Sequence, residues 1–341
     1  MATIGDVARE AGVSPSTVSY VLSGKRAISA ETARRVNEAI ARLDYTVHLG
    51  ARALRTARTM TLGVVLRFHH AEFEPAMATY LVALADAARE AGYSLQLITD
   101  EDAAAAVGRA VREQRVDGLL LLDVLEDDPR LEPLRRSPFP AVLVGMPPDP
   151  GPADAVDLDF AAAAELLVEH LADRGHERAT LVRWAPEVYA AGHTFALRFA
   201  RAAHARAAER GLALVDHDSP TTPEAVRADL ADLLGGDDRP SALLVHNDAA
   251  AAMLPTVLHD LGLRAGEDVA VVSLHSARLA SFFAIPFTSV ESAPGRVARG
   301  AVELLTSRLD AAAGAPARRL VVPELVDRGS GTGPARATPG R

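Results

Sequence analysis

The sequence predicts a two-part α/β protein: a small all-helical domain at the N-terminus, then a larger core of doubly wound parallel sheets. Two observations support this. Up to residue 44, apolar residues recur at the spacing of amphipathic helices. From residue 61, short apolar runs of strand length alternate with helical stretches, which is typical of parallel sheets covered by helices on both faces. The chain has 341 residues, enough for two or three domains of about 150 residues.

The first predicted helix begins after Thr3 and ends at Gly12. Thr3 can cap it, and Asp6 stands three residues on, in the capping-box position. Ile4, Val7, Ala8 and Ala11 share one face at helical spacing. Gly12 stands where a helix commonly ends in a left-handed residue.

Two more helices follow in the same segment. Ser14 is a good N-cap and Pro15 suits the first helical position, so the second helix begins there and ends at Gly24. Its buried side is Val18, Val21 and Leu22. Ser29 caps a third helix that runs to Leu43. The first two helices, joined by a tight turn, form a helix-turn-helix, although a three-helix bundle that binds nothing would show the same pattern.

Charge is distributed unevenly along the chain. Nine basic and five acidic side chains lie up to residue 58, a net charge of +4, while the whole chain carries −9 and the remainder therefore −13. A basic head on an acidic body fits a nucleic-acid-binding module attached to something else. The run Arg34-Arg35 in the head is interpreted as a solvated helix face or a phosphate contact.

Residues 45–59 form a marginal helix or a linker. Leu49, Ala51, Ala53 and Leu54 lie among arginines, and Gly50 interrupts them. So short a segment with so few core positions is not stable alone. It is either a plain linker or a hinge that folds on DNA.

Eight strands and several helices are predicted in the core. The strands are 61–66, 94–98, 118–122, 141–144, 180–182, 212–215, 242–245 and 269–272; the helices include 77–91, 160–174, 198–210 and 249–261. About 270 residues of this pattern indicate two lobes, with ligands bound between them at the carboxyl ends of strands. The tail, residues 330–341, is rich in Gly, Pro, Thr and Arg and is predicted to be disordered.

Several function classes lack their motifs. The sequence has no cysteine, no phosphate-binding glycine loop, no nucleophile elbow and no zinc-binding helix motif. His69 and His70 are adjacent and would point to opposite sides of an extended segment, so they make a poor metal chelate. We therefore expect no catalytic residues, no enzyme activity, no metal and no cofactor. No signal peptide or membrane span is evident, so the expected location is the cytoplasm, at the nucleoid.

The residues from Thr3 to Leu22 strongly resemble the N-terminus of the lac repressor/galactose repressor (LacI–GalR) family. The third helix, the segment from Tyr45 through Leu54, Asn247-Asp248 and the C-terminal stretch from Pro323 to Ser330 are similar to the same family. The resemblance covers nearly the whole chain and is most specific in the first 60 residues.

The resemblance implies a homodimeric repressor of transcription that binds double-stranded operator DNA. By position, Pro15, Ser16 and Tyr20 would read bases, and a hinge leucine, Leu54, would wedge into the minor groove. Many members have arginine at the position of Tyr20, so the preferred base pair there is expected to differ. The expected DNA-binding set is Thr3, Ser14, Pro15, Ser16, Thr17, Ser19, Tyr20, His48, Ala51 and Leu54.

The resemblance also implies a core like that of periplasmic sugar-binding proteins, with three crossovers between two lobes, near Asp159, Ser289 and Leu320. The expected domains are 1–44 for the helix-turn-helix, 45–59 for the hinge and 60–329 for the core. Lobe one would span about 60–159 and 290–319, and lobe two about 160–288 and 320–329.

A small-molecule effector would bind between the lobes and shift the population that has affinity for DNA. The expected effector residues are Arg67, His69, Phe73, Arg198, Asn247 and His275. His275 stands where the family usually has an aspartate that holds sugar hydroxyls. A sugar and an anionic metabolite both remain candidates. The loss of that carboxylate, with the arginine and the histidines kept, favours an anionic or less hydroxylated ligand over a plain sugar.

Two other functions are compatible with an α/β core of this kind. A transport binding protein would share the core, but it needs a signal peptide and has no use for a basic head. An α/β enzyme would need a phosphate loop or a paired acid and base in the cleft, and the sequence offers neither.

Overall fold

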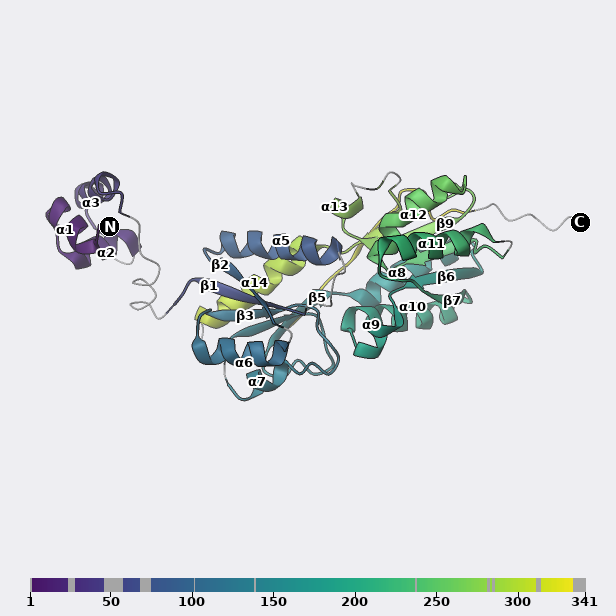
Figure 1. Cartoon of the computed structure of the whole chain (residues 1–341), viewed down its shortest axis with the longest axis horizontal. Helices are drawn as coiled ribbons and strands as arrows, with labels where there is room; N and C mark the ends of the chain where they lie inside the picture. The colour runs from purple at the N-terminus through teal and green to yellow at the C-terminus, as the bar shows by residue number, and fades with distance from the viewer. Residues whose placement is uncertain are drawn as a thin grey trace, which may run out of the picture. The chain divides into compact units, whose positions relative to one another are not determined.

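The computed structural model describes residues 2–23, 28–45, 58–67, 75–100, 102–137, 139–236, 238–280, 283, 286–310 and 314–333. It separates into two compact units, Met1–Met60 and Thr61–Arg341, each of which has its own core (Figure 1). Residues 46–57 of the predicted hinge, with His48, Ala51 and Leu54, lie outside the described residues, as do Gly24, His69 and Phe73.

The N-terminal unit contains three helices, α1 (Ile4–Ala11), α2 (Pro15–Ser23) and α3 (Ala30–Arg42). Their inward side chains form one small core of Val7, Ala8, Ala11, Val18, Val36 and Ala39. The capping box predicted for α1 is confirmed, because Thr3 accepts from the Asp6 amide while Asp6 accepts from the Thr3 amide. Gly12 is left-handed, with φ 62°, and Ser29 caps α3, both as predicted.

The first lobe of the larger unit is a six-stranded sheet in the order β11-β5-β4-β3-β1-β2, parallel throughout. Its strands are β1 (Thr61–Leu66), β2 (Ser94–Thr99), β3 (Gly118–Leu121), β4 (Ala141–Val144), β5 (Asp154–Leu158) and β11 (Arg318–Val321). Helices α5 (Pro75–Glu90) and α14 (Pro294–Asp310) cover one face, and α6 (Ala103–Glu113) and α7 (Leu131–Arg135) cover the other (Figure 1).

The second lobe repeats this plan with the order β12-β10-β9-β8-β6-β7, where only the β10–β12 pair is antiparallel. Its strands are β6 (Arg178–Arg183), β7 (Ala213–Asp218), β8 (Ala242–Val245), β9 (Ala270–His275), β10 (Thr288–Glu291) and β12 (Glu324–Val326). Its helices are α8 (Phe160–Asp173), α9 (Pro186–Ala191), α10 (Thr194–Arg210), α11 (Pro223–Gly235), α12 (Asp248–Asp260) and α13 (Ala277–Ala280).

The chain crosses between the two sheets three times. It leaves the first sheet after β5, returns after β10 into α14, and leaves again between β11 and β12. The second and third crossings therefore come after Glu291 and Val321, slightly later than the positions near Ser289 and Leu320 expected from the sequence. Each lobe is thus built from discontinuous segments, and three connections join the lobes.

All eight predicted core strands are confirmed, and four others were missed. The missed strands β5, β10, β11 and β12 are short and carry charged residues such as Asp154, Asp157 and Arg319. Their pattern lacks the apolar run that identified the others.

The prediction of disorder from residue 330 is wrong for residues 330–333. The hydroxyl of Ser330 is buried, accepts from the Thr288 amide (2.7 Å) and donates to the carbonyl of Val271 (2.6 Å). Residues 334–341 lie outside the described part. Within the described residues, no helix combines the length and hydropathy of a membrane span, and no cluster of His, Asp and Glu side chains could hold a metal ion.

Candidate functional site

The outer face of α2 is one candidate site. Val18 is fully buried in the core of the N-terminal unit, which turns the opposite face of the helix outward. Ser14, Pro15 and Ser16 are exposed at its N-terminus, and Tyr20 is 37% exposed one turn further on. The helix carries hydroxyl groups and no acidic side chain, so nothing on it would repel a phosphate backbone.

The hydroxyl groups that are predicted to contact DNA differ in the hydrogen bonds that they already make within the protein. Thr3 caps α1 and donates to Asp6 (2.7 Å). Ser14 caps α2 by accepting from the Thr17 amide (3.1 Å), and its hydroxyl lies 2.7 Å from that of Ser16. Thr17 and Ser19 are half-buried. The structure therefore brings Ser14, Pro15 and Ser16 together at one exposed helix end, with Thr17 behind them.

A cavity of about 760 Å³ between the two lobes is the second candidate site. Its walls come from the segments at the carboxyl ends of β3 to β10, together with the N-terminal turns of α5. Ligands of α/β sheets bind at this edge, outside the carboxyl ends of parallel strands. The volume falls in the range of small-molecule sites, about 300–1,000 Å³.

Aromatic rings form the wall that the second lobe contributes. Trp184 and Phe195 meet edge to face with ring centroids 5.5 Å apart, and the Phe160 ring lies 6.1 Å from Phe195. Behind them, His246 stacks on Phe199 at 3.9 Å. Burial lowers the pKa of His246 to about 3 and that of His275 to about 4. Both imidazoles are therefore neutral at pH 7.

Carboxyl groups are the only formally charged groups among the described residues of the cavity wall. They belong to Asp123, Asp157, Glu187, Asp218 and Asp248. Burial raises the pKa of Asp157 to about 7, against the opposing charge of Arg198. Asp248 accepts from the Ala76 amide of the other lobe at 3.2 Å.

Contacts among residues of the cavity wall and their neighbours join the lobes directly. The segment after β3 meets the segment between α9 and α10: the Glu126 amide donates to the carbonyl of Gly192 (2.8 Å), and the Thr194 amide donates to that of Val124 (3.0 Å). Beside them, Asp123 Oδ1 lies 2.5 Å from His193 Nδ1. One short chain segment of the first lobe therefore lines the cavity and also holds the second lobe.

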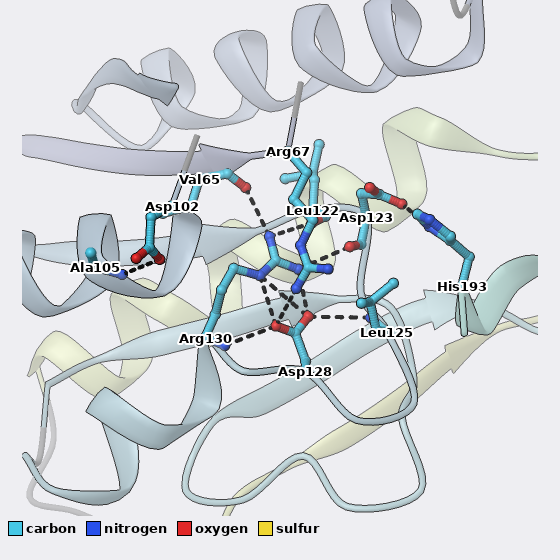
Figure 2. A network of polar contacts seen from close by, with 10 residues as sticks. All are labelled: Val65, Arg67, Asp102, Ala105, Leu122, Asp123, Leu125, Asp128, Arg130 and His193. Carbon is cyan, nitrogen blue, oxygen red and sulfur yellow. Dashed lines mark hydrogen bonds and ion pairs between the residues drawn. The ribbon is translucent and has the colours of Figure 1, made fainter. Parts of the chain in front are cut away.

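A buried ionic network fixes that segment in place (Figure 2). The Arg130 guanidinium, fully buried, donates to Asp128 and to the carbonyls of Leu122 and Asp123. Arg67 donates to the same Asp128 carboxylate at 2.7 Å. Burial alone would raise the pKa of Asp128, but these arginines hold it below its usual value. The network joins the end of β1 to the loop after β3.

In the structure, the predicted effector residues do not lie together in the cavity. His275 lines the cavity, whereas Arg67, Arg198 and Asn247 do not. Arg67 is engaged by Asp128, and Arg198 by Asp157 at 2.6 Å. Asn247 caps α12 through its Oδ1, and its buried Nδ2 has no hydrogen-bond partner. His69 and Phe73 lie outside the described residues.

Sequence reasoning missed most of the cavity wall. Trp184, the only tryptophan in the chain, follows β6, while Asp123 and Asp248 follow β3 and β8. The rule that sites gather at strand ends would have selected all three. His193 caps α10 and Phe195 lies in its first turn, and neither residue carries such a signal.

Residues 3–47 match the family described as bacterial regulatory proteins of the lacI family, and residues 168–331 match a periplasmic binding protein-like domain. The ribose operon repressor of Escherichia coli (strain K12) is 30% identical over 337 residues, which cover 97% of this chain and 100% of that protein. The transcriptional repressor PurR of Photobacterium profundum is 28% identical over 316 residues, covering 91% of this chain and 92% of that protein.

Solved structures agree in fold. A lac repressor dimer bound to operator and an anti-inducer has a TM-score of 0.79 at 24% identity, with 97% of this chain and 99% of that one covered. The complex of the transcriptional regulator CelR with cellobiose has a TM-score of 0.68 at 25% identity, with 97% and 100% covered.

Proposed function

The chain belongs to the LacI family of bacterial regulatory proteins, and we propose that it represses transcription as a dimer whose affinity for operator DNA is set by a small-molecule effector. The observation that carries this is the full-length match to a ribose operon repressor, which includes both the helical unit and the two-lobed core. The exposed face of α2 and the cavity between the lobes supply the two sites that this function needs.

The DNA-binding assignment rests on α2. Pro15, Ser16 and Tyr20 would reach base edges in the major groove, with Ser14, Thr17 and Ser19 near the backbone. Thr3 would contact phosphate only by sharing a hydroxyl that already caps α1. For the hinge, His48, Ala51 and Leu54 stay as proposed from the sequence, with Leu54 as the wedge that kinks the duplex.

The effector would bind in the cavity between the lobes. A ligand that touches Asp123 and Trp184 would engage loops of both lobes, so its binding energy would differ between open and closed arrangements. That difference is what an effector needs in order to shift the population that binds DNA. His275 remains the proposed contact from the sequence set, while Arg67, Arg198 and Asn247 support the wall from behind.

Catalysis is not part of this proposal, because the relatives are transcriptional repressors and the sequence has no phosphate-binding glycine loop, nucleophile elbow or zinc-binding helix motif. A repressor works at the chromosome, so we place this protein in the cytoplasm, at the nucleoid.

The test is selection of bound duplexes from a random DNA pool by the full-length protein at two salt concentrations. We expect a near-palindromic sequence at both. Tyr20→Arg should change the preferred pair at one position of each half-site towards guanine, since arginine reads guanine with two hydrogen bonds. Asn37→Ala, on the exposed side of α3, should keep the original preference. Binding without sequence preference at either salt concentration would contradict the proposal.

A further inference from the structure

Residues 327–333, the C-terminal strap, lie against the second lobe at the end of its sheet away from the cavity. Ser330 fixes the middle of the strap. Its hydroxyl bonds to the Thr288 amide and the Val271 carbonyl, and its own carbonyl accepts from the Val271 amide at 2.7 Å. Val271 and Thr288 lie at the N-terminal ends of β9 and β10, whereas the cavity lies at their carboxyl ends.

Asp327 holds the first turn of the strap. Its Oδ1 accepts from the Gly329 amide (2.9 Å) and from the Thr288 hydroxyl (3.1 Å), and its Oδ2 accepts from Arg174 at the end of α8 (2.6 Å). The hydrogen bond from the Gly329 amide is the main reason why the pKa of Asp327 lies below its usual value. The carboxylate therefore stays charged over the whole range in which a histidine titrates.

The guanidinium that holds Asp327 also contacts His170, one turn back in α8. Arg174 Nη1 lies 3.2 Å from His170 Nδ1 and donates to the His170 carbonyl at 3.3 Å. Arginine can only donate, so Nδ1 accepts and the proton of the neutral imidazole is on Nε2. A second proton would turn Nδ1 into a donor and place another positive charge beside the guanidinium. Protonated His170 is therefore incompatible with Arg174 in this position.

The strap leaves the His170 ring no room to move. His170 is buried, and its Nε2 has no hydrogen-bond partner among the described residues. A Cβ atom at Gly331 would lie 2.5 Å from that nitrogen, so only glycine fits there. His176 Nε2 lies 3.3 Å from the Gly331 carbonyl oxygen on the same stretch. A ring that shifted to accommodate a proton would have to displace the strap.

The charges around His170 act in the same direction as this geometry. The ionisable groups that face it come from its own helix, the turn after that helix and the strap: Arg174, Asp173, His176 and Asp327. Asp173 is itself paired with Arg210 of α10 at 2.6 Å. Burial, followed by the charge of Arg174, lowers the pKa of His170 despite the two carboxylates. The closed strap thus disfavours the proton that solvent would supply.

We propose that the C-terminal strap is an acid-sensitive latch: protonation of His170 displaces Arg174 from Asp327 and frees residues 327–333 from β9 and β10. Above the ordinary histidine pKa of about 6.5, His170 is neutral whether the strap is closed or open, so the latch keeps its full strength. Below about pH 6.5 the open form binds the proton more tightly, and the opening equilibrium rises by up to about tenfold per pH unit. This device goes beyond the proposed function, because it needs neither DNA nor an effector.

Hydrogen exchange of the full-length protein at about pH 7.5 and about pH 5.5, corrected for the intrinsic effect of pH on exchange, tests the latch. The amides of Arg328 and Gly329 report on the strap, and those of Val271 and Thr288 report on the strand ends that it holds. We expect these amides to lose protection by at least about threefold at the lower pH. A smaller loss would overturn the proposal.

Two variants assign the effect to His170. His170→Asn can keep an acceptor near Nδ1 but cannot titrate, so its loss of protection should stay below about threefold. His204→Asn removes an exposed histidine of the same lobe, which is bonded to Asp216 at 2.8 Å, and should behave like the wild type. An equal loss in the wild type and in His170→Asn would overturn the proposal.

Gly331→Ala tests the packing of the strap without a change of pH. Its Cβ would collide with the His170 ring, so the same amides should lose protection by at least about tenfold at about pH 7.5. Adding His170→Asn removes Nε2 and should restore protection to within about threefold of His170→Asn alone. No loss in Gly331→Ala, or a loss that the second substitution does not restore, would show that the strap does not rest on His170 and would overturn the latch.

Discussion

At the scale of single residues, His246 shows how strongly the surroundings control a titratable group. It follows β8, stacks on Phe199 and is buried in the wall of the cavity. Burial penalises the charged imidazole and lowers its pKa to about 3. His275 shifts in the same direction for the same reason. The core therefore contains two histidines that must stay neutral in order to stay buried.

The stability of the core should fall with acidity because of these groups. The unfolded chain takes up a proton on each histidine below its ordinary pKa of about 6.5, whereas folded His246 does so only near pH 3. Its contribution is complete above about pH 6.5 and is lost as the pH falls, by about 1.4 kcal/mol per pH unit. Urea unfolding of the wild type and of His246→Phe, from about pH 8 to pH 5, measures this.

His246→Phe keeps a ring against Phe199 but cannot titrate. The slope of its unfolding free energy against pH should therefore be smaller, by the amount that corresponds to about one proton bound on unfolding. The difference between the two proteins at about pH 8 reports packing alone and serves as the internal control. If that difference stayed constant down to about pH 5, the neutral state of His246 would not contribute as argued.

Site residues were predicted with uneven success, for a physical reason. Local signals identified the caps Thr3, Ser14 and Ser29, because a cap acts within three residues along the chain. The cavity wall brings Asp123, Trp184 and His275 together from distant strand ends, where only the rule that sites gather at strand ends, and not the spacing between the residues, could have selected them. Arg198 carries the right chemistry for a ligand, but Asp157 satisfies it first.

At the scale of elements, the turn between α1 and α2 is held by α3. Arg35 donates from Nε and Nη2 to the carbonyl of Ala11 (3.1 and 2.7 Å) and from Nη2 to that of Gly12 (3.1 Å). Its neighbour Arg34 is exposed and pairs with Glu38 one turn away. Arg35 therefore holds the turn between the helices, whereas Arg34 lies on a solvated helix face. The sequence alone did not distinguish these two roles.

Replacing Arg35 should loosen the whole N-terminal unit. Arg35→Ala removes charged donors from two carbonyls at the helix end, which should cost about 1.5–3 kcal/mol. Arg34→Ala removes only an exposed pair and should cost less than about 1 kcal/mol. Hydrogen exchange of residues 2–45 in the full-length protein measures both. If Arg35 instead mainly contacted phosphate, its loss would reduce the salt dependence of DNA binding and leave exchange unchanged.

Elements of the core were predictable where the strand sequence is an apolar run, and burial alone did not suffice, because β5 is buried along its whole length but carries Asp154 and Asp157 and was missed. The central strands β1, β3, β4, β8 and β9 read as continuous apolar runs, as expected for parallel strands covered by helices. Strand β11 lies at the edge of its sheet and exposes three of its four residues. Strand β11 pairs with β5 only after the chain has passed through the second lobe and come back. Local sequence propensity cannot predict such a long-range pairing.

At the scale of the whole molecule, the two units have separate cores and opposite charge. The N-terminal core contains Val7, Ala8, Ala11, Val18, Val36 and Ala39 and shares no member with the clusters of the larger unit. In a regulator built in this way, the larger unit has to change the affinity for DNA without changing the stability of the smaller unit. The units should therefore be stable independently and become coupled only when both ligands are present.

Calorimetry of the full-length protein should accordingly show two transitions. Operator DNA at about 100 times its dissociation constant should stabilise the N-terminal unit by about 2.7 kcal/mol and leave the core transition in place. A cavity ligand alone should raise only the core transition. With both present, linkage requires the ligand to change the DNA-dependent shift of the first transition by the free energy with which it changes operator affinity. A single transition that moved as one with either ligand would mean that the units are not separate, and a DNA-dependent shift that ignored the cavity ligand would mean that the cavity does not control DNA binding.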